Sequence, residues 1–208
     1  MRPLMTMLLG FVLFGAAALA AEPPEFVIRA ATQANLQALR AGGFVLYMRH
    51  GNTDPTRPDR APQVDLNDCS TQRPLTEEGR RLAARIGEYL RRANIPLGEI
   101  RASPLCRARE SAQAAFGERF AVDNLLMYSG NMTDQEKAPV VARTRALLTQ
   151  PVAPGTNRLI LAHAPNLMDV MGYFPKPEGT VVILKPSPGG EFEYVASILP
   201  QHWPDLLQ

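Results

Sequence analysis

The chain has 208 residues and a formal net charge of +2, from 22 Lys and Arg against 20 Asp and Glu. This length suits one domain with a sizeable hydrophobic core. A charge so close to neutral leaves no electrostatic footprint for nucleic acid, so we expect no nucleic-acid partner. Arginine greatly outnumbers lysine, which favours planar recognition of phosphate or carboxylate.

Residues 1–20 are typical of a secretory signal peptide. Arg2 supplies the positive start, residues 5–19 are apolar and uncharged, and Ala18-Leu19-Ala20 has the small-x-small pattern of a cleavage site. The apolar stretch is short for a membrane span of ~20 residues, which disfavours an uncleaved anchor. We therefore expect a signal peptide over 1–20 and a single domain over 21–208. The protein should be periplasmic or secreted, with no stable membrane span after cleavage.

Hydrophobic spacing and turn residues predict alternating helices and strands along the domain. A helix is expected over 32–41, where Gly42-Gly43 ends it, and a buried strand over 44–48. Residues 52–74 are rich in Pro, Asp, Asn and Arg and predict a long surface loop, a kind of segment that is often functional. Thr76 then caps a helix whose apolar positions continue to Ala93.

The second half of the chain continues this alternation. Its expected elements are a weak strand over 98–103, a helix opening at Pro104, a short strand over 120–122, a helix over 139–150 with Pro139 in its first turn, a strand over 158–162, a short helix over 166–171 and an antiparallel pair over 180–185 and 192–199. This order predicts an α/β fold of three layers, α/β/α. Its sheet should be mostly parallel with an antiparallel C-terminal hairpin.

Two of the three histidines occupy equivalent places in this pattern. His50 ends the apolar run that begins at Phe44, and His163 ends the run that begins at Arg158. Ligand sites in open parallel sheets lie beyond the carboxyl ends of the strands, so we expect both imidazoles at that edge. A hydrogen-bonded histidine at a strand end would explain either residue alone. The pair, together with nearby arginines, favours a reactive site.

The residues around these histidines suit phosphoryl transfer, which needs a nucleophile and cations or amides around the phosphoryl oxygens. Neutral imidazole is a competent nucleophile, and Arg49 beside His50 can grip phosphate as a planar fork. Arg107 lies near a helix start, where backbone amides favour anions; a surface pair with Glu110 is the alternative. Two cysteines and three scattered histidines make a metal site improbable.

At these residues the chain resembles the histidine phosphatase superfamily, also called the phosphoglycerate mutase-like fold. The resemblance runs from about residue 44 to residue 199. Its motifs are Arg49-His50-Gly51, Leu75-Thr-Glu-Glu-Gly79, Ser103-Pro-Leu-Cys-Arg107-Ala108, His163 after a late strand, and Glu178-Gly-Thr-Val before the last hairpin. It implies that His50 is the nucleophile that becomes phosphohistidine. It also implies that Arg49, Arg107 and His163 bind the phosphoryl group, with Gly51 and Thr53 at the substrate site, and that no cofactor or metal takes part.

The two cysteines extend the resemblance. Asp68-Cys69-Ser-Thr-Gln-Arg73 and Cys106-Arg107 resemble exported members of the superfamily, among them lipopolysaccharide-core heptose phosphatases. The resemblance brings both segments to one rim, and two cysteines that follow an export signal are expected to pair, so we predict a Cys69–Cys106 disulfide. The substrate implied is a phosphorylated small molecule or an envelope glycan.

Two departures from the family's pattern leave the proton donor unassigned. Met127 stands where the mutase-like branch has a glutamate, and Ala164 stands where the acid-phosphatase branch has an aspartate. The remaining candidates are water, His163 and four carboxylates: Asp54, Asp123, Asp134 and Glu136.

The leading hypothesis is an exported, metal-independent phosphomonoesterase that works through phosphohistidine on His50. A phosphomutase is disfavoured because the glutamate is missing and because the chain carries an export signal. A non-catalytic binder of phosphorylated ligands is favoured by the missing acid and disfavoured by the intact Arg49, Arg107 and His163. Turnover of an aryl phosphate, which has a good leaving group, distinguishes an enzyme from a binder.

Overall fold

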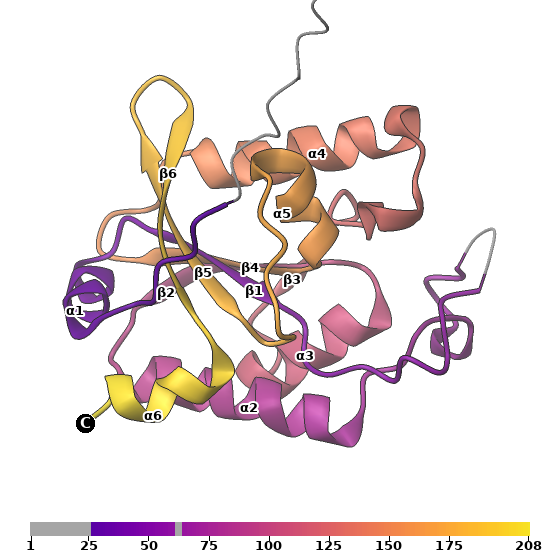
Figure 1. Ribbon diagram of the computed structural model, residues 1–208, viewed down its shortest axis with the longest axis horizontal. Coiled ribbons are helices and arrows are strands. Elements are labelled where there is room, and N and C mark those ends of the chain that lie inside the picture. The colour runs from indigo at the N-terminus through magenta and orange to yellow at the C-terminus, as the bar shows by residue number, and fades with distance from the viewer. Residues whose placement is uncertain (1–25, 61–63) are drawn as a thin grey trace, which may run out of the picture.

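The computed structural model describes residues 26–60 and 64–208. The predicted signal peptide over 1–20 lies outside these residues. Within them, helices and strands alternate along the chain (Figure 1). No helix in the two described ranges is long and apolar enough to cross a membrane.

The described strands form one six-stranded sheet, in the order β3-β2-β4-β1-β5-β6. They are β1 (Val45–Arg49), β2 (Leu97–Ala102), β3 (Ala121–Val122), β4 (Asn157–Ala162), β5 (Val181–Ser187) and β6 (Glu191–Ile198). Strands β1 to β4 pair in parallel, whereas β5 is antiparallel to both β1 and β6. The predicted mostly parallel sheet with an antiparallel C-terminal hairpin is confirmed.

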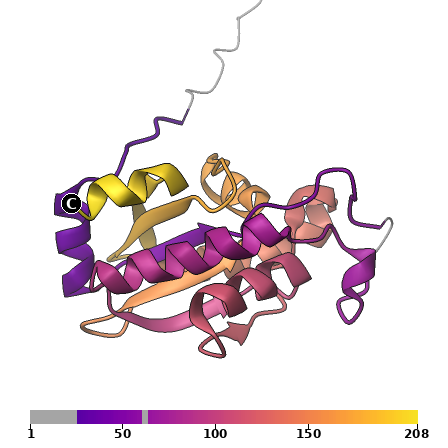
Figure 2. The same ribbon diagram turned by 90° about the horizontal axis from the view of Figure 1, so that it is seen from below.

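Helices cover both faces of this sheet, which confirms the three-layer prediction. One face carries α2 (Glu77–Arg92), α3 (Cys106–Phe116) and α6 (Trp203–Leu206), and α2 and α3 stand in front of the sheet in Figure 2. The other face carries α4 (Asp134–Thr149) and α5 (Ala164–Met171).

Successive side chains of β1 point to opposite faces of the sheet and so contribute to two separate hydrophobic clusters. Leu46 and Met48 join the cluster that includes α2, α3 and the buried leucines of α1 (Gln33–Ala41), whereas Val45 and Tyr47 join the cluster under α4 and α5. Because both faces of β1 are buried, its continuous apolar run is explained.

The C-terminal helix completes the first of these clusters. Trp203, the single tryptophan of the chain, is fully buried in α6. It stacks on Tyr89 of α2, with ring centroids 5.7 Å apart. This contact fixes the end of the chain against the second half of α2.

Helix α4 begins earlier than predicted, so the predicted range of 139–150 is wrong at its start. Thr133 caps the helix: its hydroxyl accepts a hydrogen bond from the Glu136 amide, and Glu136 Oε2 accepts one from the Thr133 amide at 2.8 Å. This reciprocal pattern is a capping box, and its Thr-x-x-Glu signature is visible in the sequence. Pro139 consequently lies inside the helix instead of in its first turn.

Two glycines bring the segment after β1 against the start of α2. A Cβ atom on Gly51 would lie 2.3 Å from the carbonyl oxygen of Gly79, and one on Gly79 would lie 2.1 Å from the carbonyl oxygen of Asn52. Only glycine allows this backbone contact, which explains why both motifs end in glycine. The contact holds the residue after His50 in place.

Candidate active site

The carboxyl ends of β1 and β4 place His50 and His163 side by side. The strands are adjacent and parallel, with Arg49 opposite Ala162, so each strand is followed by a histidine at the same edge. The two imidazole centroids are 5.3 Å apart, and both residues are buried. The structure therefore brings together the two histidines that the strand pattern singled out.

His50 is oriented by its own main chain. Its Nδ1 lies 2.9 Å from the Gly51 carbonyl oxygen, which only accepts hydrogen bonds, so we assign the proton to Nδ1 and the lone pair to Nε2. Burial, followed by the positive charge of Arg107, holds the pKa of His50 well below the usual histidine range. The imidazole is therefore neutral near pH 7, which is the form that a nucleophile requires.

His163 is held by the neighbouring strand and by an aromatic ring. Its Nε2 lies 2.7 Å from the Ser103 hydroxyl oxygen at the end of β2, and the Tyr128 ring meets it edge to face with centroids 5.5 Å apart. Its Nδ1 is buried and has no partner in the part of the chain that the structure describes. Burial and then Arg107 lower the pKa of His163 as well. A buried imidazole nitrogen without a partner is suited to meet a ligand.

Arg107 is the fully buried cation of this site, in the first turn of α3. Its Nη1 donates to Asp59 Oδ1 at 2.8 Å, whereas its Nε and Nη2 are buried without a partner among the described residues. The alternative of a surface pair with Glu110 is wrong, because Glu110 pairs with Arg80 instead. Unpartnered N–H groups on a buried guanidinium beside a neutral imidazole can bind an anion.

Arg49 is anchored by Glu178, which precedes β5. Its Nη2 lies 3.3 Å from Glu178 Oε1, and its Nη1 donates to the Pro175 carbonyl oxygen at 3.0 Å. Thr53 donates to the same carboxylate, from its hydroxyl at 2.7 Å and from its amide at 2.9 Å. Glu178 Oε1 also lies 3.9 Å from His50 Nδ1. The structure thus shows Thr53 positioning a carboxylate beside His50.

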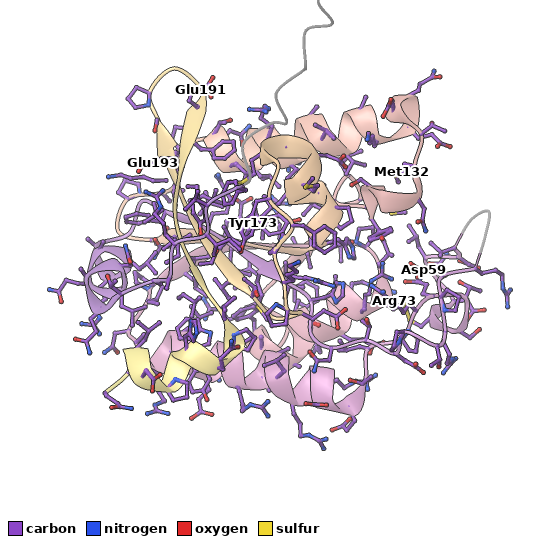
Figure 3. All side chains as sticks on the ribbon, viewed as in Figure 1. Asp59, Arg73, Met132, Tyr173, Glu191 and Glu193 are labelled. Carbon is purple, nitrogen blue, oxygen red and sulfur yellow. A yellow bond between two sulfur atoms is a disulfide. The ribbon has the colours of Figure 1, made fainter. Side chains whose placement is uncertain are left out.

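Sequence reasoning missed three charged residues at this site: Asp59, Arg73 and Glu178. Asp59 Oδ1 accepts from the Arg73 amide at 2.8 Å as well as from Arg107, and Arg73 Nη2 lies 3.9 Å from Glu178 Oε1. Figure 3 shows Asp59 and Arg73 beside each other on the loop after β1. For Asp59 the only indication in the sequence was the length and polarity of that loop, whereas Arg73 and Glu178 stood in motifs of the resemblance without a role assigned to them.

A family model described as histidine phosphatase superfamily (branch 1) matches residues 45–126. This range contains Arg49, His50 and Arg107, and the fold places His163 beside them. The match shows that this segment, less than half of the 208 residues, is similar to the histidine phosphatase superfamily.

Solved structures share this fold over most of the chain. The protein histidine phosphatase SixA complexed with tungstate aligns with a TM-score of 0.56 at 19% identity, over 76% of this chain and 98% of that chain. The alpha-ribazole phosphatase from Shigella flexneri aligns with a TM-score of 0.53 at 16% identity, over 76% and 96%. Phosphoserine phosphatase from Entamoeba histolytica aligns with a TM-score of 0.50 at 13% identity, over 77% and 98%. No match to the chain was found among curated proteins.

The structure engages the four candidate proton donors in contacts away from the two histidines. Asp123 pairs with Arg143 at 2.7 Å, and Asp134 is almost fully exposed beside Lys137. Hydrogen bonds from Thr56 lower the pKa of Asp54, and those from Thr133 lower the pKa of Glu136, so both carboxylates are ionised near neutral pH and carry no proton to donate. The proton donor therefore stays unassigned among them.

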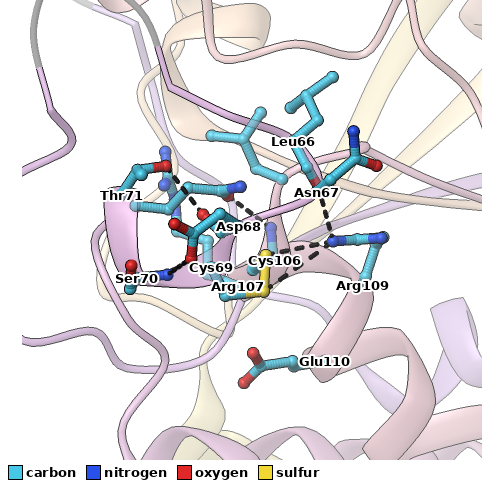
Figure 4. Close-up of a disulfide and its surroundings, with 12 residues drawn as sticks. Leu66, Asn67, Asp68, Cys69, Ser70, Thr71, Cys106, Arg107, Arg109 and Glu110 are labelled. Carbon is cyan, nitrogen blue, oxygen red and sulfur yellow. Dashed lines mark hydrogen bonds between the residues drawn. A yellow bond between two sulfur atoms is a disulfide. The ribbon is translucent and has the colours of Figure 1, made fainter.

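The predicted Cys69–Cys106 disulfide is confirmed, with an S–S distance of 2.03 Å (Figure 4). It joins the 3-10 helix η1 (Cys69–Thr71) to the start of α3. Gln72 Oε1 also accepts from the Cys106 amide at 2.7 Å, and Arg109 Nη2 donates to the Leu66 carbonyl oxygen at 3.1 Å. The loop that carries Asp59 and Arg73 is thereby fixed to the helix that carries Arg107.

The structure shows no group of three or more His, Cys, Asp or Glu side chains arranged to hold a metal ion within residues 26–60 and 64–208. The cations that face the two imidazoles are arginines. Metal-independent activity stays a prediction.

Proposed function

We propose that this protein is a phosphatase that forms a phosphohistidine on His50 Nε2. The observation that carries the proposal is a neutral, buried imidazole with Nε2 free, next to a buried Arg107 whose Nε and Nη2 lack partners among the described residues. A nucleophile beside unsatisfied positive donors is the arrangement that a phosphoryl group needs.

The proposed reaction has two displacements at phosphorus. In the first, His50 Nε2 forms a bond to phosphorus, the bond from phosphorus to the ester oxygen breaks, and the ester oxygen departs as an oxyanion that then takes a proton from water. In the second, water attacks phosphorus and releases inorganic phosphate and free His50. Arg49, Arg107 and His163 stabilise the phosphoryl oxygens in both steps. His163 Nδ1 has no partner among the described residues, and it carries the proton when the Ser103 hydroxyl donates to Nε2.

Export and metal independence are also part of the proposal. Residues 1–20 have the pattern of a signal peptide, and a structural disulfide is typical of oxidising compartments outside the cytosol. The arginines supply the positive charge that a metal supplies in other phosphatases. A phosphorylated small molecule or an envelope glycan, as in heptose phosphatases, is the substrate expected from the resemblance.

Trapping the intermediate tests the function. Rapid quenching with a labelled phosphate ester should leave an acid-labile, alkali-stable label on His50. His50→Ala should abolish labelling and turnover, whereas the matched control His202→Ala, on the 3-10 helix η3 (Pro200–His202), should keep both. Wild-type turnover in His50→Ala would disprove the proposed nucleophile.

A phosphate-binding protein without turnover is the second candidate. It is favoured by the engagement of Asp54, Asp123, Asp134 and Glu136 away from the histidines. An aryl phosphate separates the two functions, because its leaving oxygen needs little protonation. Tight binding of that ester with no phosphate release would identify a binding protein.

A further inference from the structure

A cleft with a volume of about 630 Å³ opens beside His50, Arg107 and His163, which are called the phosphate-binding residues below. Five apolar side chains from three segments line it: Val64 and Leu66 from the loop after β1, Leu105 before α3, and Met127 and Met132 before α4. Figure 3 shows Asp59 and Met132 at the same end of the molecule, on two of these segments. The volume falls within the range of small-molecule sites, roughly 300–1,000 Å³.

Two residues join this cleft to the phosphate-binding residues. Asp59 and Tyr128 both line the cleft. Asp59 Oδ1 is 2.8 Å from Arg107 Nη1, and the Arg107 guanidinium lies 5.3 Å from the Tyr128 ring centroid. The same ring touches His163 edge to face. A group esterified to a phosphate on Arg107 therefore has this cleft as its neighbouring space.

Three of the five polar residues of the cleft wall lie toward solvent, whereas Asp59 and Tyr128 are half-buried and contact Arg107. Arg60, Asn131 and Glu136 are exposed, and Glu136 is committed to the capping box of α4. Leu105 is buried, while Val64, Leu66, Met127 and Met132 are half-buried. The inner wall thus offers apolar and aromatic surface with few hydrogen-bonding groups for a sugar.

Met127 connects the apolar lining of the cleft with the acidity that the leaving oxygen needs. The mutase-like branch of the superfamily has a glutamate at this position, whereas here the thioether side chain of Met127 lines the cleft. A leaving group that departs without a proton donor must have an acidic oxygen, and phenol-type oxygens have that property. Thioether and tyrosine side chains also contact aromatic rings favourably.

We propose that this cleft binds the leaving group of the substrate, and that the substrates are phosphate esters of aromatic alcohols. The inference rests on the proposed phosphatase function and specifies its substrate class. Apolar walls select the ring. Met127 replaces the glutamate that would donate a proton, and the Asp59 carboxylate in the cleft wall is paired with Arg107, so efficient turnover is restricted to esters whose oxygen leaves readily.

The test separates ring size from leaving-group acidity by comparing 2-naphthyl phosphate with phenyl phosphate, since both leave as phenol-type oxygens. The larger ring buries more apolar area, so kcat/KM should be about tenfold higher for the naphthyl ester. Met132→Glu places a charge in the cleft and should remove this preference. The matched control Met168→Glu, at a half-exposed position of α5, should keep it.

Binding of 2-naphthylphosphonate and phenylphosphonate provides a measurement that needs no turnover. Tighter binding of the naphthyl compound, lost in Met132→Glu and kept in Met168→Glu, supports the cleft. Equal binding and equal kcat/KM for the two rings would overturn it, as would a sugar phosphate that is hydrolysed faster than either ester. If no ester releases phosphate, the proposed function fails, and the phosphonates alone decide whether the cleft binds aromatic groups.

Discussion

The proposed phosphate-binding residues and the cleft beside them are built in different ways. His50, His163 and Arg107 are buried side chains that follow β1, follow β4 and open α3. The cleft wall consists mainly of half-buried side chains on two irregular segments, over 64–66 and 127–132. Positions on regular elements hold charges with high precision, whereas loops accept substitution more readily. The proposed reaction and the proposed choice of substrate therefore depend on separate parts of the chain.

Removal of the buried cation should give the largest effect and should act on all substrates equally. Arg107→Ala is expected to lower kcat/KM about 10³-fold, because a preorganised donor to the developing charge is lost. Naphthyl and phenyl phosphate should lose the same factor. Arg81→Ala, at a mostly exposed position of α2, is the control. A loss of kcat/KM for naphthyl phosphate alone would show that Arg107 also acts through the cleft, and would contradict the separation of the cleft from the phosphate-binding residues.

Removal of the disulfide should affect stability and the cleft together. The bond spans a sequence separation of 37 residues, so the double variant Cys69→Ser/Cys106→Ser should lose ~3–4 kcal/mol of unfolding free energy in the chain-entropy model. Because Arg109 ties Leu66 to the same crosslink, the naphthyl preference should also fall. Urea unfolding and the two esters measure these effects. An unchanged preference would show that Leu66 is held by other contacts.

Acidification should lower the stability of the folded protein through His50 and His163 at a higher pH than that at which carboxylates become protonated. The pKa values of His50 and His163 are depressed in the folded protein, so the unfolded chain binds protons first as pH falls below about 6.5. The free energy of unfolding should then decrease by up to about 1.4 kcal/mol per pH unit for each histidine, until the folded pKa is reached. Urea unfolding between pH 7 and pH 5 checks this, and His50→Asn should flatten the slope. A steeper slope in that variant would contradict the assignment.

Asp59 lines the cleft and also contacts Arg107, and its replacement should give the smallest of these effects, a change in vanadate affinity. Its carboxylate occupies Arg107 Nη1, where it competes with an incoming anion. Asp59→Asn should therefore bind orthovanadate several-fold more tightly, since one negative charge is removed next to the site. Inhibition constants for vanadate measure the change. Weaker inhibition would show that Asp59 holds Arg107 in the geometry that binds the anion.

Local patterns were sufficient to predict the two histidines. An apolar run that ends in a polar residue identifies a strand and its carboxyl end. Adjacent parallel strands bring these ends together, as β1 and β4 do for His50 and His163. Arg107 was indicated by its position near a helix start, and its role by the family resemblance. The disulfide was predicted from the presence of only two cysteines after an export signal, together with that resemblance. The start of α4 was misplaced although the pattern of Thr133 and Glu136 was present in the sequence.

The remaining contacts depend on how distant segments meet, which no local pattern encodes. Asp59 reaches Arg107 through the fold of a long loop, and Glu178 reaches Arg49 and Thr53 across more than a hundred residues of sequence. The cleft is a similar case, because Leu66, Leu105 and Met132 become neighbours only when the loop, α3 and α4 are in place. Periodicity and propensity describe elements one at a time.

The position of Trp203 has a spectroscopic consequence. As the single tryptophan, it provides essentially all of the indole fluorescence, and it is buried against Tyr89. Tyr89 is ten residues along α2 from Gly79, which touches the segment after His50, and ten residues of helix span about 15 Å. Occupation of the phosphate-binding residues should therefore leave the emission unchanged, while unfolding shifts it to longer wavelength. The chain carries a built-in optical reporter that distinguishes loss of structure from ligand binding.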